Sequence, residues 1–119
     1  MTDTADTPQD RLVAFVRAVN AQRTGGGDGV AFESDAGRLD YADRTVTLEL
    51  GDEERERLDA LLDEYPVFKV KQPETRKAPD GVVVLSAIAD AKHLADFLES
   101  VFRDVFDADE GYELRVLDD

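Results

Sequence analysis

The sequence predicts an α+β fold, in which an antiparallel sheet carries helices on one of its faces. Two observations predict this class. Several segments alternate apolar and polar residues, as half-buried strands do, and the segments between them repeat apolar residues every three or four positions, as amphipathic helices do. A length of 119 residues suits one domain, which would bury roughly two-thirds of the surface that its unfolded chain exposes. We therefore expect a single domain over residues 1–119, with residues 1–6 forming a disordered tail.

Residues 7–44 predict one helix followed by two short strands. Thr7 offers a hydroxyl N-cap, Pro8 suits the first helical position, and Asp10 lies near the positive end of the helix dipole. The apolar residues that follow at helical spacing are Leu12, Phe15, Val16 and Val19. A run of three glycines then ends the helix. The short strands are expected at 30–32 and 38–41.

Residues 45–117 predict six elements in the order strand, helix, strand, strand, helix, strand. The expected strands lie at 45–50, 67–71, 82–88 and 112–116. The two helices follow Asp52 and Asp90, which are suited to cap them. Their apolar stripes are Leu58, Leu61, Leu62 and Tyr65 in the first helix, and Leu94, Phe97, Leu98, Val101, Phe102, Val105 and Phe106 in the second. The second stripe is the strongest helical signal in the chain.

This order of elements resembles the ferredoxin-like βαββαβ arrangement. The resemblance implies a four-stranded antiparallel sheet with two helices on one face. The N-terminal helix and short strands would then extend that sheet or cover its other face. The resemblance includes no sequence motif, so it implies a fold and no activity. Acylphosphatases share the order but hold phosphate with a Gly-rich, Arg-bearing loop after the first strand; the corresponding residues 50–54 are acidic here, so we expect no such activity.

The chain carries 28 Asp and Glu residues against 14 Lys and Arg, a net charge of -14. Small domains commonly carry a net charge of roughly 2–8. The carboxylates therefore repel one another at low salt and are screened in molar salt, where the Debye length falls to about 3 Å. Asp outnumbers Glu 18 to 10, and Arg outnumbers Lys 10 to 4. This composition resembles that of cytosolic haloarchaeal proteins, and the chain resembles the uncharacterised small acidic proteins of these organisms. The alternative is an acidic mesophilic protein that binds cations or basic partners.

The composition also excludes several chemistries. The chain has no Cys and a single His, His93, which excludes disulfides, Fe–S clusters, thiolate zinc sites, Cys nucleophiles and multi-His metal sites. We expect no cofactor. The first ten residues lack the basic and apolar regions of a signal peptide, and no apolar run approaches the roughly 20 residues of a membrane span. We therefore expect a cytoplasmic protein without membrane contact.

Several local patterns suggest function, and each has a simpler structural explanation. The Gly-rich segment 24–29 lacks the preceding strand and following Lys of a phosphate-binding loop, so we interpret it as a connector. Residues 107–113 resemble the start of a calcium loop but have Tyr112 where that loop needs Gly, which favours a helix end and a turn. His93 is expected at the surface, and the helix carboxylates, Glu99 among them, are expected to be solvated. No catalytic, cofactor-binding or metal-binding residue is predicted.

One cluster departs from the acidic background, and we call it the basic patch. It consists of Lys69, Lys71, Arg76 and Lys77. The two lysines at 69 and 71 share one face of the expected strand, and the other two residues lie on the loop that follows. The patch is our candidate partner-binding surface, for an acidic protein surface or for phosphates. The alternatives are protection of an exposed sheet edge and local counter-charge within an acidic fold. Nucleic acid is disfavoured by the net charge and by the absence of stacking aromatic residues.

From the sequence we expect a non-enzymatic protein-interaction or regulatory module. We expect it to form a homodimer through a sheet edge or through the uncovered face of the sheet. The alternative is a small-ligand-sensing βαββαβ domain whose ligand lies near Gly51, at the turn between the first strand of that unit and its helix. A hydrolase or transferase that uses only carboxylates and hydroxyls is the third hypothesis.

Overall fold

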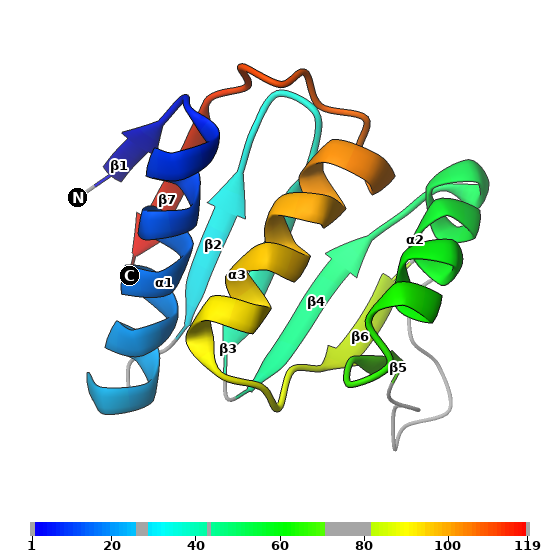
Figure 1. The fold of residues 1–119 in the computed structure, drawn as a ribbon, viewed down its shortest axis with the longest axis horizontal. Coiled ribbons are helices and arrows are strands. Elements are labelled where there is room, and N and C mark those ends of the chain that lie inside the picture. The colour runs from blue at the N-terminus through cyan, green and yellow to red at the C-terminus, as the bar shows by residue number, and fades with distance from the viewer. Residues whose placement is uncertain (1, 26–28, 43, 71–81, 119) are drawn as a thin grey trace.

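The computed structural model describes residues 2–25, 29–42, 44–70 and 82–118. Within these residues the chain forms one antiparallel sheet of seven strands, in the order β1-β7-β2-β3-β4-β6-β5. The three α-helices lie on the same face of this sheet, as Figure 1 shows. The predicted α+β class is therefore confirmed.

The chain begins with an edge strand and the first helix. β1 (Thr2–Ala5) pairs with the C-terminal strand β7 (Leu114–Asp118), so residues 2–5 form a strand where the sequence suggested a disordered tail. α1 (Pro8–Gly25) begins at the predicted cap, because the Oγ1 of Thr7 accepts a hydrogen bond from the backbone N–H of Asp10 at 3.2 Å.

The hairpin of β2 (Val30–Glu33) and β3 (Arg38–Ala42) forms as expected, but its position changes the sheet. A ferredoxin-like sheet would have four strands, with β7 directly beside β4 (Thr45–Glu49). Here the hairpin lies between those two strands, since β2 pairs with β7 and β3 pairs with β4. The sheet therefore has seven strands, and the ferredoxin-like arrangement is not confirmed.

The remaining elements follow the predicted order along the chain. They are α2 (Asp52–Glu64), β5 (Lys69–Val70), β6 (Val82–Ser86), α3 (Ala91–Ser100) and the π-helical turn η1 (Val101–Val105). Asp90 caps α3 as predicted, by accepting from the backbone N–H of His93 at 3.2 Å. α2 has Gly51 at its N-cap, and the Gly51 N–H donates to the Glu54 carboxylate at 2.9 Å.

The long apolar stripe of the last helix is buried along its whole length, as predicted. Its final turn is not α-helical, however, since the N–H of Phe106 donates to the carbonyl of Val101, five residues earlier, at 2.9 Å. The guanidinium of Arg57 on α2 donates to the carbonyl of Val105 at 2.9 and 3.0 Å, which joins α2 to this turn.

The strand side chains divide into two sets because successive residues point to opposite faces of the sheet. One set faces the helices and is buried: Val30, Phe32, Leu39, Tyr41, Val46, Leu48, Val83, Leu85, Leu114 and Val116. Aromatic rings fill the layer between sheet and helices, with centroids 4.9 Å apart for Phe15 and Phe32 and 4.3 Å apart for Phe68 and Phe97. The other set lies on the face that carries no helix.

Candidate functional site

Only one residue of the predicted basic patch can be placed. Lys69 lies in β5, is exposed, and stands opposite Ser86 of β6 in the strand register. Lys71, Arg76 and Lys77 lie outside the described residues. The patch as a partner-binding surface therefore stays a prediction.

The other sequence candidates lie apart from one another. His93 is exposed, as predicted, and its ring stacks on that of Phe68 with centroids 5.5 Å apart. The N–H of Gly51, near which a small ligand was considered, is already bound by Glu54. Among the described residues, no group of three or more acidic or histidine side chains is arranged to hold a metal ion. In the same residues, no helix is both long and apolar enough to cross a membrane.

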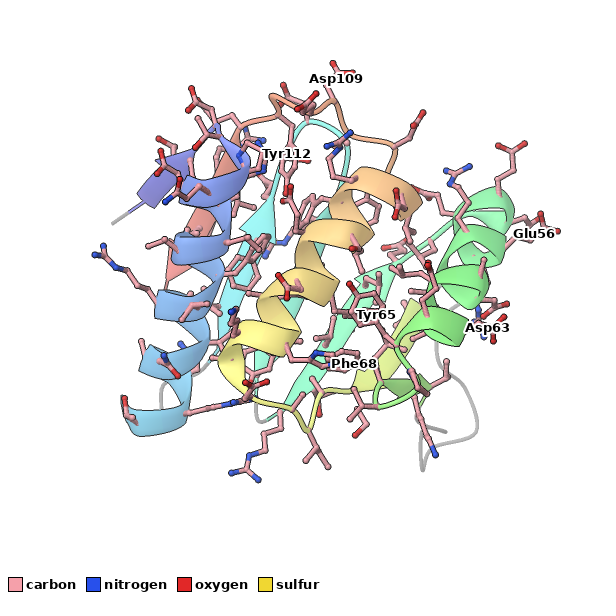
Figure 2. All side chains as sticks on the ribbon, viewed as in Figure 1. Glu56, Asp63, Tyr65, Phe68, Asp109 and Tyr112 are labelled. Atoms are coloured by element: carbon pink, nitrogen blue, oxygen red, sulfur yellow. The ribbon has the colours of Figure 1, made fainter. Side chains whose placement is uncertain are left out.

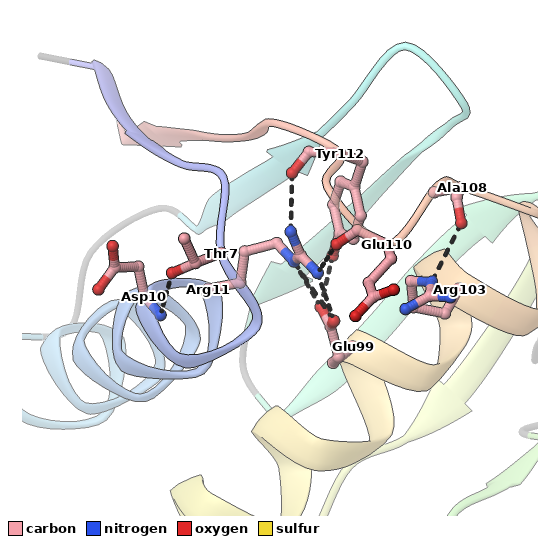
Figure 3. A network of polar contacts seen from close by, with 8 residues as sticks. All are labelled: Thr7, Asp10, Arg11, Glu99, Arg103, Ala108, Glu110 and Tyr112. Carbon is pink, nitrogen blue, oxygen red and sulfur yellow. Dashed lines mark hydrogen bonds and ion pairs between the residues drawn. The ribbon is translucent and has the colours of Figure 1, made fainter.

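A buried ionic cluster that the sequence did not reveal joins α1, α3 and the loop before β7 (Figure 3). Arg11 has no exposed surface, and its Nη2 lies 2.9 Å from the carboxylate of Glu99. Its guanidinium also donates to the backbone carbonyls of Tyr112 at 2.8 Å and Glu110 at 2.7 Å, and it lies 3.9 Å from the centroid of the Tyr112 ring. The Tyr112 hydroxyl donates to the same Glu99 carboxylate at 2.7 Å. Glu99, expected to be solvated, is thus an internal ion-pair partner.

The charges of this cluster are satisfied within the chain, which indicates a packing role. Burial lowers the pKa of Arg11, but the hydrogen bond and charge of Glu99 raise it by more, so the guanidinium stays ionised. Burial raises the pKa of the Tyr112 phenol, and its hydrogen bond to Glu99 raises it further, so the hydroxyl keeps its proton. One sequence signal pointed to the buried position: Arg11 stands four residues before Phe15 and eight before Val19, on the same helix face.

The face of the sheet opposite the helices carries no helix among the described residues, and we call it the open face. Alternation along the strands and the register between neighbouring strands assign its described members. They are Thr4, Ala31, Glu33, Arg38, Asp40, Ala42, Thr45, Thr47, Glu49, Lys69, Val82, Val84, Ser86, Arg115 and Leu117. Antiparallel sheets commonly leave one face to solvent, so its side chains decide what it can contact.

A row of alternating charge crosses four neighbouring strands at one end of the open face. We call it the charge row: Arg115 of β7, Glu33 of β2, Arg38 of β3 and Glu49 of β4. Arg115 lies 3.2 Å and Arg38 lies 3.7 Å from the Glu33 carboxylate. Burial lowers the pKa of Arg115, but the hydrogen bonds that it donates to Glu33 and Asp35 and the charges of these carboxylates raise it by more, so its guanidinium stays ionised. Such cross-strand pairs align neighbouring strands.

The rest of the open face is smooth and almost neutral. Beside the charge row lie small or half-buried side chains, among them Ala42, Thr47, Val84 and Leu117. In total the described open face has three basic side chains and three acidic ones. The helix α2 alone has seven acidic and two basic residues, and Figure 2 shows Glu56 and Asp63 pointing outward from it. The acidic excess is therefore placed away from the open face.

Comparison with known proteins gives one match. Neither the curated proteins nor the solved structures include a chain that matches this one. A family model does match, and it spans residues 1–118. The chain therefore belongs to DUF7975, a family of unknown function.

Proposed function

We propose that this protein is a non-enzymatic interaction module that associates with a second copy of itself through the open face. The observation that supports this most is the charge balance of that face in a chain whose net charge is -14. Interaction surfaces are depleted of uncompensated charge relative to the rest of a protein surface. A face with equal numbers of acidic and basic groups can approach another copy without the repulsion that the helix side would meet.

The charge row favours a second copy as the partner, because it is self-complementary. In a two-fold symmetric dimer, residue i of one copy faces residue j of the other, and residue j faces residue i. A two-fold axis between Glu33 and Arg38 would place Glu33 opposite the partner's Arg38, and Arg115 opposite the partner's Glu49. Both pairs then join opposite charges.

The size of the open face suits a modest dimer. Seven strands about 4.8 Å apart, of which six have four or five residues and β5 has two, cover at most roughly 29 by 17 Å, a flat area of up to about 500 Å² before side-chain relief. Stable interfaces bury about 800 Å² per partner, so the face approaches the lower end of the standard range. We therefore expect the open face alone to support a dimer with a dissociation constant in the micromolar range.

The charge row provides a test that separates association from folding. We expect Arg38→Glu and Glu33→Arg each to weaken the dimer by about tenfold or more, since each places like charges opposite each other across the axis. When the two variants are mixed, every cross-axis pair again joins opposite charges, so a heterodimer should form. Each chain still lacks its own Glu33–Arg38 pair, so recovery in the mixture cannot come from repaired folding. Sedimentation velocity in molar KCl measures all three samples.

A matched control uses the same kind of surface change elsewhere. Val84→Glu, at a half-buried position of the open face on β6, should abolish association, whereas Val13→Glu on the exposed side of α1 should leave it unchanged. A wild-type protein that stays monomeric at concentrations well above the micromolar range would contradict the proposal. So would a mixture of the two charge variants that fails to associate.

A further inference from the structure

The end of α1, the turn from β3 to β4 and the segment from β6 to α3 lie at the same end of the molecule (Figure 1), and a small pocket lies among them. It has a volume of about 240 Å³ and is lined by Arg23, Arg44, Ile88 and Ala89. Two cations thus line one hollow in a protein with twice as many acidic as basic residues. This combination is the feature that we pursue.

The two arginines of the pocket differ from most others in the described chain. Arginines 11, 38, 55, 57 and 115 each have a carboxylate within 4.0 Å. Among the described residues, Arg23 and Arg44 have no such ion pair. An arginine without a carboxylate partner can offer an anion those donors that no other group of the protein accepts from.

The segment between β6 and α3 contacts both the Arg23 side chain and the Arg44 backbone. Arg23 donates through Nε to the Tyr41 hydroxyl at 3.2 Å, and through Nη2 to the carbonyls of Ala87 and Ala89. No described residue accepts from its Nη1. The carbonyl of Arg44 accepts from the backbone N–H of Ala87 at 2.9 Å, which fixes the turn that carries this second guanidinium. The Arg23 guanidinium and the Arg44 backbone are therefore positioned before any ligand arrives, which reduces the entropic cost of binding.

The backbone of Arg44 adds an independent observation. Its φ is 57°, in the left-handed region that side-chain-bearing residues seldom adopt. Such conformations are unfavourable and gather at functional sites, where the surrounding contacts maintain them. Asn or Gly would be the usual residue at this position of a tight turn. An arginine at this position therefore has a strained backbone.

We propose that Arg23 and Arg44 form a binding site for a small oxyanion, a carboxylate or a phosphate group, beside the apolar side chain of Ile88. The Arg44 guanidinium can match either oxyanion in a two-pronged geometry, and the Nη1 of Arg23 can donate to the same anion. The Ile88 side chain is 65% exposed and lines the same hollow, so a short apolar group attached to the anion has a surface to contact. Pockets for drug-sized ligands have volumes of roughly 300–1,000 Å³, so this site takes a small acid rather than a nucleotide.

The site is tested by NMR titration of the full chain in KCl, with ionic strength held constant. Inorganic phosphate, acetate and isobutyrate serve as probes and distinguish the two oxyanions and the contribution of the apolar group. We expect at least one probe to shift the Arg23 Nε–H, the Ile88 methyl and the Ala89 amide signals. Tighter binding of isobutyrate than of acetate, together with a shift of the Ile88 methyl signal, would show that the apolar group contacts Ile88.

The variants separate a specific site from general charge attraction. We expect Arg44→Gln to weaken binding about tenfold, the effect of losing one charge-assisted hydrogen bond. Arg44→Lys, which keeps the charge but loses the fork, should bind with intermediate affinity. Arg17→Gln removes one charge from an exposed position on α1 and should bind as the wild type does. The proposal is overturned if no probe shifts these signals beyond matched KCl, or if Arg17→Gln weakens binding as much as Arg44→Gln. Neither result depends on whether the chain dimerises.

Discussion

At the scale of single residues, the ionic cluster of Arg11, Glu99 and Tyr112 shows what local sequence patterns cannot predict. The Arg11 and Glu99 side chains meet across 88 positions of sequence, and an arginine within an amphipathic helix is normally solvated. Removing one partner would leave the other buried and unpaired, which typically costs 3–5 kcal/mol. The cluster fixes the orientation of α1 on α3 rather than adding reactivity.

The Tyr112 hydroxyl makes the cluster sensitive to alkaline pH. Its pKa in the folded chain is raised by burial and by the Glu99 carboxylate, above the ordinary value of 10.0 that holds in the unfolded chain. Below pH 10 both states are protonated and stability is complete. Above it the unfolded state releases the proton first, so stability should fall by up to about 1.4 kcal/mol per pH unit from this group.

Urea unfolding between pH 8 and pH 11 measures this slope. We expect Tyr112→Phe to be less stable than the wild type at pH 8, because the hydroxyl no longer donates to Glu99, by about 1 kcal/mol. The variant should also lose stability less steeply above pH 10. Equal slopes for the two proteins would show that Tyr112 ionises as freely in the folded state as in the unfolded state.

At the scale of elements, the sequence predicted where the helices and strands lie along the chain better than it predicted which strands are neighbours in the sheet. Caps at Thr7 and Asp90 and the stripe that ends at Phe106 are local features, and each is present in the structure. Strand order depends on contacts between distant segments, so the insertion of the β2–β3 hairpin between β7 and β4 is only weakly indicated by the local sequence. One hint was the unbroken apolar run Val30–Phe32, which is typical of a strand buried inside a sheet.

The π-helical turn was also beyond prediction, because its apolar spacing fits an α-helix equally well. Its geometry depends on tertiary contacts: Arg57 of α2 binds the Val105 carbonyl, and the turn between β2 and β3 packs against Phe106. The open face was predicted only as a possible dimer surface. Its charge row could not be foreseen, because the row exists only through the register of four strands.

Gly37 tests the contact between the β2–β3 turn and the end of η1. A Cβ at this position would lie 2.7 Å from the Cγ of Phe106, closer than nonbonded carbon atoms approach. Because the Phe106 ring is buried and has little room to move, we expect Gly37→Ala to destabilise the fold by about 1–3 kcal/mol. Gly111→Ala is the matched control, since a Cβ there meets nothing within 4 Å. Urea midpoints compare the two variants, and equal midpoints would show that the turn does not press on Phe106.

At the scale of the whole molecule, the distribution of charge separates two surfaces. The open face is balanced, whereas α2 and the loop after η1 carry much of the acidic excess. The helix surface is therefore the part that repels itself at low salt, and the open face is the part that can meet a second copy. Origin in a high-salt cytoplasm stays a prediction from composition, but the salt response of the fold can be tested directly.

We expect the melting temperature to rise with KCl concentration, because salt screens repulsion among the carboxylates of α2 more than it weakens the buried contacts. The triple change Glu56→Gln, Asp63→Asn and Glu64→Gln removes three exposed charges that take part in none of the ion pairs among the described residues. This variant should melt at a higher temperature than the wild type at low KCl and should gain less from added KCl. Val13→Glu adds a charge on α1, outside this surface, and should keep the wild-type gain. If the melting temperatures of the triple variant and the wild type rise equally with KCl, the salt response does not come from the acidic surface of α2.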